Sequence, residues 1–123
     1  MSLSLSYQKY GNKPAEVDGH VFSSRAEASR YAELRLLERA GQIADLRLQP
    51  RFVLQPAFVD NKGQRQSAVH YTADFAYREL GNLREVVEEV KGVMDKAAAI
   101  RIRLFIFQHR EVDFRLVRME AAR

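Results

Sequence analysis

Cysteine is absent from the 123-residue sequence, and no long apolar run occurs in it. Without cysteine the chain can form no disulfide, no zinc site with thiolate ligands and no cysteine nucleophile. No apolar stretch approaches the roughly 20 residues that a membrane-spanning helix needs, and the first residues lack the charged-then-apolar layout of a secretion signal. We therefore expect a cytoplasmic protein without a membrane partner.

Composition and charge indicate one folded domain with a basic C-terminal segment. Apolar residues make up 46% of the chain and charged residues 29%, which is typical of a globular domain rather than a disordered chain. The net charge of +4 arises from residues 96–123, which hold seven basic and three acidic side chains, because residues 1–95 hold 13 of each sign. This excess favours a polyanionic partner, although ordinary solubilising surface charge also explains it.

The spacing of apolar and turn residues predicts an α/β fold. Residues 1–20 are interpreted as a basic, mobile arm that includes Lys9 and Lys13, and residues 21–123 as the folded domain. An apolar stripe predicts a helix over residues 25–40. The other expected elements are irregular strand around 46–54, strands over 67–79 and 83–91, a helix over 96–108 and a strand over 112–117. The resulting order is helix, three strands, helix, strand.

A Gly-Asn turn at residues 81–82 sets a register for the second and third strands. If these residues form a two-residue hairpin loop, the numbers of paired residues sum to 163. This register places Arg78 opposite Glu85, a complementary cross-strand pair. It also places Asp74 directly opposite Glu89, with Cβ atoms about 4.5–5.5 Å apart. Because two facing carboxylates repel, the sheet needs a shared proton or a bound cation at that point.

The ligand type at this point favours a hard divalent cation such as Mg²⁺. Lys91 shares the face of Glu89 in the expected strand, about 7 Å further along it. A bound ion polarises a phosphoryl oxygen and activates a water molecule, while a nearby ammonium group stabilises charge that grows on the phosphate. Asp74, Glu89 and Lys91 in this arrangement suit phosphodiester hydrolysis. Glu88 alternates to the opposite face, where we expect it to be solvated.

Glu27 has two interpretations that stay open at this point. It lies at the N-terminal end of the apolar stripe of the first helix, where a carboxylate would join Asp74 and Glu89 as a ligand of the metal or of its water. In the alternative, Ser24 and Glu27 form a capping box, in which the Glu27 side chain bonds back to the Ser24 amide. Spacing alone favours the cap.

Two other groups of residues also have alternative roles. The aromatic residues of the expected 67–79 strand alternate onto one face, which is more typical of a core than of a platform for stacking bases: Tyr71, Phe75 and Tyr77. The basic residues of the expected second helix form either a solvated face or a set of phosphate contacts: Lys96, Arg101 and Arg103.

Several segments resemble known proteins. Residues 71–75 (Tyr-Thr-Ala-Asp-Phe) and 86–92 (Val-Val-Glu-Glu-Val-Lys-Gly) resemble the Asp…Glu-x-Lys motif of the PD-(D/E)XK nuclease superfamily. Ala73 stands where that motif has proline. Three further segments resemble a small phage-associated family of uncharacterised proteins placed in this superfamily, so that the resemblance covers nearly the whole chain: residues 9–13, 22–27 and 48–52.

The resemblance implies a restriction-endonuclease-like core, with the order α-β-β-β-α-β and a mixed central sheet flanked by helices. It implies that Asp74, Glu89 and the carbonyl group of Val90 bind Mg²⁺ or Mn²⁺. Lys91 would be the catalytic lysine. Glu27 would match the first-helix glutamate of many members, including phage Holliday-junction resolvases, which favours the site over the cap.

Two hypotheses for function follow. The first is a metal-dependent DNA endonuclease acting on branched or recombination-intermediate DNA, of phage or prophage origin in a bacterial cell. In it Glu27 binds a second ion or its water, and five basic residues contact the DNA backbone: Lys9, Lys13, Lys96, Arg101 and Arg103. The second hypothesis is a non-catalytic nucleic-acid-binding module with a nuclease-like fold. We expect a homodimer, because two sites most easily cut the two strands of a junction.

Overall fold

A computed structural model describes residues 14–90 and 94–118, which form a mixed α/β fold around a four-stranded sheet. The sheet has the spatial order β10-β9-β8-β3. β9 pairs antiparallel with β8 and parallel with β10, and β8 pairs antiparallel with β3, so the sheet is mixed. Its strands are β3 (Ile43–Leu48), β8 (Phe75–Glu79), β9 (Glu85–Val90) and β10 (Asp113–Val117).

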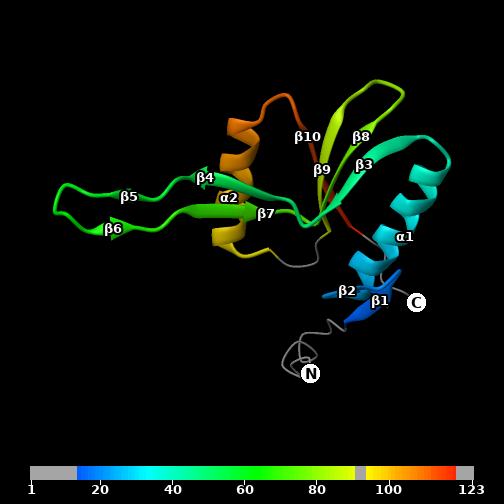
Figure 1. Ribbon diagram of the computed structural model, residues 1–123, viewed down its shortest axis with the longest axis horizontal. Helices are drawn as coiled ribbons and strands as arrows, with labels where there is room; N and C mark the ends of the chain where they lie inside the picture. The colour runs from blue at the N-terminus through cyan, green and yellow to red at the C-terminus, as the bar shows by residue number, and fades with distance from the viewer. Residues whose placement is uncertain (1–13, 91–93, 119–123) are drawn as a thin grey trace.

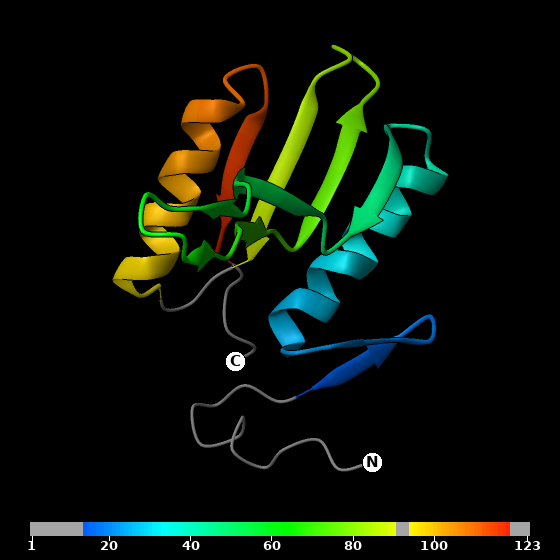
Figure 2. The ribbon, with the colours of Figure 1, turned by 60° about the vertical axis from the view of Figure 1, so that its left-hand side comes forward.

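One helix covers each face of this sheet (Figure 2). α1 (Arg25–Arg39) packs on the face that carries Phe75 and Tyr77, and α2 (Lys96–Gln108) packs on the face that carries Ala76. Successive side chains of a strand point to opposite faces, so β8 and β9 each supply residues to two separate apolar clusters. The two clusters account for the apolar character of these central strands.

The helix termini follow from capping residues in the sequence. The Ser24 hydroxyl accepts a hydrogen bond from the Glu27 amide at 3.1 Å, and Asp95 accepts one from the Ala98 amide at 2.7 Å. Each cap satisfies an amide that has no partner within the helix. Gly41, with φ of +77°, follows the end of α1. The helix predicted over 96–108 is confirmed with those bounds, and the helix predicted over 25–40 ends one residue earlier.

Two pairs of short strands form an arm between β3 and β8. β4 (Arg51–Gln55) pairs with β7 (Val69–Thr72), and β5 (Phe58–Val59) pairs with β6 (Arg65–Gln66) further out. We call residues 51–72 the ribbon; it projects away from the central sheet (Figure 1). The strand predicted over 67–79 is therefore wrong as a single element. It breaks at Ala73 and Asp74, so that β7 belongs to the ribbon and β8 to the central sheet.

The break also changes which aromatic residues share a cluster. Tyr71 belongs to the cluster under α2, whereas Phe75 and Tyr77 belong to the cluster under α1. All three are buried in a core, as predicted, but they do not form one face. The register predicted for the next hairpin is confirmed, since β8 and β9 pair with residue numbers that sum to 163. Its loop comprises residues 80–83 rather than two residues.

The elements that build the central layers follow the predicted order of helix, three strands, helix and strand: α1, β3, β8, β9, α2, β10. The irregular strand expected around 46–54, however, divides into β3 of the central sheet and β4 of the ribbon. A hairpin of β1 (Ala15–Val17) and β2 (His20–Phe22) precedes them and packs against α1. Of the arm predicted for residues 1–20, residues 1–13 lie outside the described residues. Neither helix of the described residues is long and apolar enough to cross a membrane.

Glu88 is fully buried, which contradicts the prediction that it is solvated. It lies on the sheet face that packs against α1. Arg30 of that helix donates two hydrogen bonds to it, at 2.9 Å from Nε and 2.7 Å from Nη2, and the Tyr77 hydroxyl donates another. This two-point contact neutralises a carboxylate that would otherwise be costly to bury.

We expect Arg30→Ala to destabilise the fold by about 3–5 kcal/mol, because it leaves a buried carboxylate without its cation. Urea unfolding measures the change. Glu33→Ala is the matched control: it removes the exposed partner of Arg30 and should change the stability by less than about 1 kcal/mol. A similar small effect for both variants would contradict this assignment.

Candidate functional site

Asp74 lies at the point where the ribbon joins the central sheet. The chain leaves β3 through Gln49, which has a left-handed backbone with φ of +51°. The Gln49 amide donates to the Asp74 carbonyl at 2.9 Å, and the Asp74 amide donates to the Glu88 carbonyl at 3.0 Å. The first bond continues the β3–β8 register, in which Leu48 pairs with Phe75, whereas the second is displaced by one residue from the β8–β9 register. Asp74 thus lies beside Glu89 at the edge of the sheet where β9 ends, but the two do not form a regular cross-strand pair.

Three carboxyl groups meet at this edge. Glu27, in the first turn of α1, is 6% exposed, and its carboxyl group shares a hydrogen bond with that of Asp74. The negative charges of Glu27 and Glu89 both act on Asp74. The second oxygen of Asp74 accepts a hydrogen bond from the Val90 amide at 2.7 Å. The structure thus brings together Glu27, Asp74, Glu89 and the main chain of Val90.

Only half of the capping box forms. The Glu27 amide donates to the Ser24 hydroxyl, but the Glu27 carboxylate, instead of bonding back to the Ser24 amide, accepts a hydrogen bond from the Ser23 hydroxyl and contacts Asp74. The cap therefore fixes the backbone of the first turn and leaves the carboxyl group directed at the sheet edge.

Burial and neighbouring carboxylates raise the pKa of Asp74 to about 9. Burial is the largest cause, followed by the hydrogen bond with Glu27 and the charges of Glu27 and Glu89; the Val90 amide acts in the opposite direction. At neutral pH the Asp74 carboxyl group thus holds a proton that it shares with Glu27. A shared proton is one of the two ways to reduce the repulsion between neighbouring carboxylates, and a bound cation is the other.

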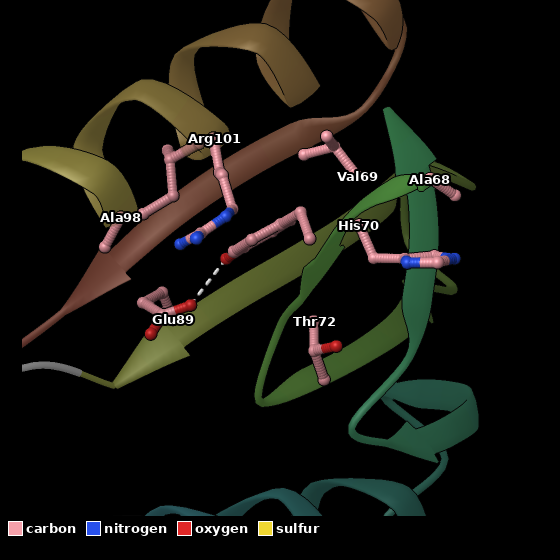
Figure 3. A pocket seen from close by; sticks show the side chains of 9 residues that line it. Ala68, Val69, His70, Thr72, Glu89, Ala98 and Arg101 are labelled. Carbon is pink, nitrogen blue, oxygen red and sulfur yellow. Dashed lines mark hydrogen bonds between the residues drawn. The ribbon is translucent and has the colours of Figure 1, made fainter. Parts of the chain in front are cut away.

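A cleft of about 490 Å³ opens beside Glu89. β7 forms one wall, α2 forms the other, and Arg101 extends its guanidinium group into the cleft toward Glu89 (Figure 3). The Tyr71 hydroxyl donates a hydrogen bond to Glu89 at 2.5 Å. Burial, followed by the hydrogen bond to Glu89 and the charge of Glu89, raises the pKa of Tyr71, so that its hydroxyl stays a donor. The cleft gives a ligand access to one of the three carboxylates.

The basic residues of the predicted site are placed as follows. Lys96 and Arg103 are exposed on α2, and Arg101 is exposed at the cleft. The remaining ones lie outside the described residues: Lys9, Lys13 and Lys91.

Two site residues were missed by the sequence reasoning. Tyr71 was interpreted as core rather than as a site residue, and Ser23 was assigned no part in the site. Their roles depend on the break after Tyr71 and on the direction of the Glu27 carboxylate. A tyrosine three residues before Asp74 was the one available signal.

Carboxylate and carbonyl oxygens are ligands that suit Mg²⁺ or Mn²⁺. In residues 14–90 and 94–118, no group of three or more histidine, aspartate and glutamate side chains is arranged to hold a metal ion. The carboxyl groups instead bond to one another, to serine, to tyrosine and to an amide. The donor chemistry fits a hard cation, which would take the place of the shared proton.

The chain belongs to a family described as a protein of unknown function, DUF1064, whose match covers residues 7–121. No curated protein and no solved structure matches the chain.

We expect Asp74→Asn to be more stable than the wild-type protein at neutral pH. Asp74 keeps its proton up to about pH 9 in the folded protein and loses it near pH 4 when unfolded. The wild-type stability contributed by this group is therefore present at low pH and decreases from about pH 4 to pH 9. Between pH 5 and pH 8 the free energy of unfolding of the variant should rise by about 2–4 kcal/mol relative to that of the wild type. Urea unfolding in EDTA measures this difference.

The control for this prediction is Glu111→Gln, which removes a carboxylate whose side chain is 74% exposed. Its stability should follow the pH dependence of the wild type. An Asp74→Asn protein with the wild-type pH dependence would show that Asp74 does not hold a proton at neutral pH.

Proposed function

We propose that this protein is a metal-dependent DNA endonuclease with a restriction-endonuclease-like core. The observation that carries the proposal is the convergence of Glu27, Asp74 and Glu89 at one edge of the sheet. Natural sequences rarely bury like charges together without a compensating function. Binding of a divalent cation would be such a function, because the cation removes the repulsion between the three carboxylates.

The arrangement of the elements supports the fold part of the proposal. The order α1, β3, β8, β9, α2, β10 is the order of a restriction-endonuclease-like core. Of the two carboxylates of its motif, Glu89 lies in β9 and Asp74 directly precedes β8, the neighbouring strand. Glu27 on α1 reaches the same edge. Membership of DUF1064 neither adds to this argument nor opposes it.

Each site residue has a chemical role in the proposal. Asp74, Glu89 and the Val90 carbonyl would hold Mg²⁺ or Mn²⁺, which when bound polarises a phosphoryl oxygen and lowers the pKa of a water molecule. Tyr71 orients the Glu89 carboxylate through its hydrogen bond. Glu27 orients Asp74 through their shared hydrogen bond and would bind a second ion or its water.

Residues outside the carboxylate group complete the site. Lys91 positions the attacking water or stabilises charge on the phosphate. Arg101 presents a cation in the cleft beside Glu89, and Lys96 and Arg103 lie on the same helix. Together with Lys9 and Lys13 these residues contact DNA phosphates. Branched or recombination-intermediate DNA is the proposed substrate.

We also propose that the protein acts as a homodimer in the bacterial cytoplasm, since two sites cut two strands. The apolar side chains of Ile100, Leu104 and Phe107 follow a helical stripe on the outer face of α2 and are 49%, 43% and 64% exposed. An exposed apolar stripe of this kind suits packing against another helix.

We expect the protein to cleave DNA with Mg²⁺ or Mn²⁺ and not with EDTA. The substrates to compare are supercoiled, linear, single-stranded and four-way-junction DNA. Asp74→Ala, Glu89→Gln and Lys91→Ala should each lower the cleavage rate by about 10²–10³-fold or more, because each removes a group that stabilises the transition state.

Glu85→Gln is the matched control, because Glu85 lies in β9 with Glu89 but pairs with Arg47 at the surface. It should cleave at the wild-type rate. Cleavage of no substrate with either metal ion would exclude the endonuclease, and binding that persists in EDTA would then favour the non-catalytic nucleic-acid-binding module.

A further inference from the structure

The ribbon begins at the candidate site and extends far from it (Figure 1). At its base the Ala73 amide donates to the Pro50 carbonyl at 3.0 Å, next to the bond between Gln49 and Asp74, so the pairing of β3 with β8 continues into the ribbon. Asp60, at the tip, follows nine residues after Arg51. At about 3.3 Å per residue, the tip reaches up to about 30 Å from the base.

The tip has a defined conformation. Asp60 accepts hydrogen bonds from the Lys62 and Gln64 amides, both at 2.9 Å, and from the Gln66 side chain at 3.0 Å. Gly63, with φ of +80°, allows the turn. Asp60 is the one acidic residue in 51–72, and its carboxylate is satisfied within the turn. Lys62 and Arg65 outnumber this carboxylate, so residues 58–66 carry a net charge of +1.

The outer part of the ribbon exposes both charged and apolar side chains. Lys62 and Arg65 are exposed, and so are Phe58 and Val59, which are 46% and 63% accessible. An isolated two-stranded ribbon is marginally stable. The stability of the fold therefore does not explain why the ribbon extends beyond the cleft. Two strands with their side chains are of a width that the major groove of duplex DNA admits.

The base of the ribbon also forms one wall of the cleft. Residues 68–72 line the cleft together with Glu89 and Arg101 (Figure 3). A DNA backbone held beside Glu89 thus runs along the inner part of the ribbon. Arg65 and Lys62 are three and six residues before Ala68 at the outer end of the cleft, so at about 3.3 Å per residue they lie within about 10–20 Å of it. This distance is about half a helical turn of DNA or less, since one turn is about 34 Å long.

We infer that the ribbon tip lies in the major groove of duplex DNA, with Lys62 and Arg65 on the phosphates at the edges of the groove. The inference rests on the proposed function for the position of the DNA at Glu89. It adds a duplex-specific contact remote from the carboxylates. The apolar side chains of Phe58 and Val59 then contact sugars and base methyl groups in the groove.

The test compares Lys62→Ala/Arg65→Ala with Arg39→Ala/Arg84→Ala, which removes the same charge from exposed positions at the C-terminal end of α1 and next to the β8–β9 loop. Fluorescence anisotropy measures binding of the full chain to a duplex of about two helical turns and to its single strand, in EDTA. Each lost phosphate contact makes the salt dependence shallower by about 0.9 in log–log slope. Between about 50 and 200 mM salt, wild-type affinity for duplex should therefore fall about tenfold more than that of the ribbon variant.

The control variant should keep the wild-type salt dependence, and single-strand binding should not distinguish the two variants. Equal duplex binding by both variants overturns the inference, as does a wild-type protein that binds no duplex. A dimer that Phe58→Ser converts to monomer, with duplex binding unaffected by Lys62→Ala/Arg65→Ala, overturns it in favour of a second copy of the chain.

Cleavage measured on the same samples separates the two proposals. Ribbon-dependent duplex binding without cleavage by any metal ion supports the ribbon inference and removes the endonuclease. Metal-dependent cleavage with duplex binding that does not depend on the ribbon removes the ribbon inference alone.

Discussion

Glu88 and Glu89 are consecutive residues of β9, so their side chains lie on opposite faces of the central sheet and in different surroundings. Glu88 enters the α1 cluster, where Arg30 neutralises it through two hydrogen bonds. Glu89 faces the cleft and, with Glu27, raises the pKa of Asp74. Because side chains alternate strictly along a strand, the pairing of β8 with β9 determines both outcomes at once. One carboxylate is neutralised by a cation of the fold, and the other belongs to a group that costs stability until it takes up a proton or a cation.

The place of the ribbon in the chain explains how the residues around Asp74 and Glu89 come together. It is inserted between β3 and β8, so its two strands leave and rejoin the sheet beside Asp74. The same insertion supplies Tyr71 to hold Glu89 and supplies one wall of the cleft. The ribbon thus adds residues that could contact a ligand to a site built on the strands of the central sheet. The ribbon is also the segment that extends furthest from the sheet, and it begins at this site.

Local signals predicted the elements well where capping and turn residues are strong. Asp95 fixed the start of α2, and the charge pair of Arg78 with Glu85 identified the β8–β9 register. Long-range contacts were not predictable in this way. Arg30 lies 58 residues from Glu88, so the burial of that glutamate had no local signal. The break between β7 and β8 at Ala73 and Asp74 contains no glycine or proline. The sequence therefore contains no signal that the strand predicted over 67–79 is interrupted there.

Calorimetric titration with Mn²⁺ at pH 7, in buffers of different ionisation enthalpy, tests most directly whether the three carboxyl groups exchange a shared proton for a cation. Metal binding to protonated ligands releases protons to the buffer. The account predicts release of about one proton for each Mn²⁺ bound. Binding of Mn²⁺ without proton release, or no binding at all, would contradict it.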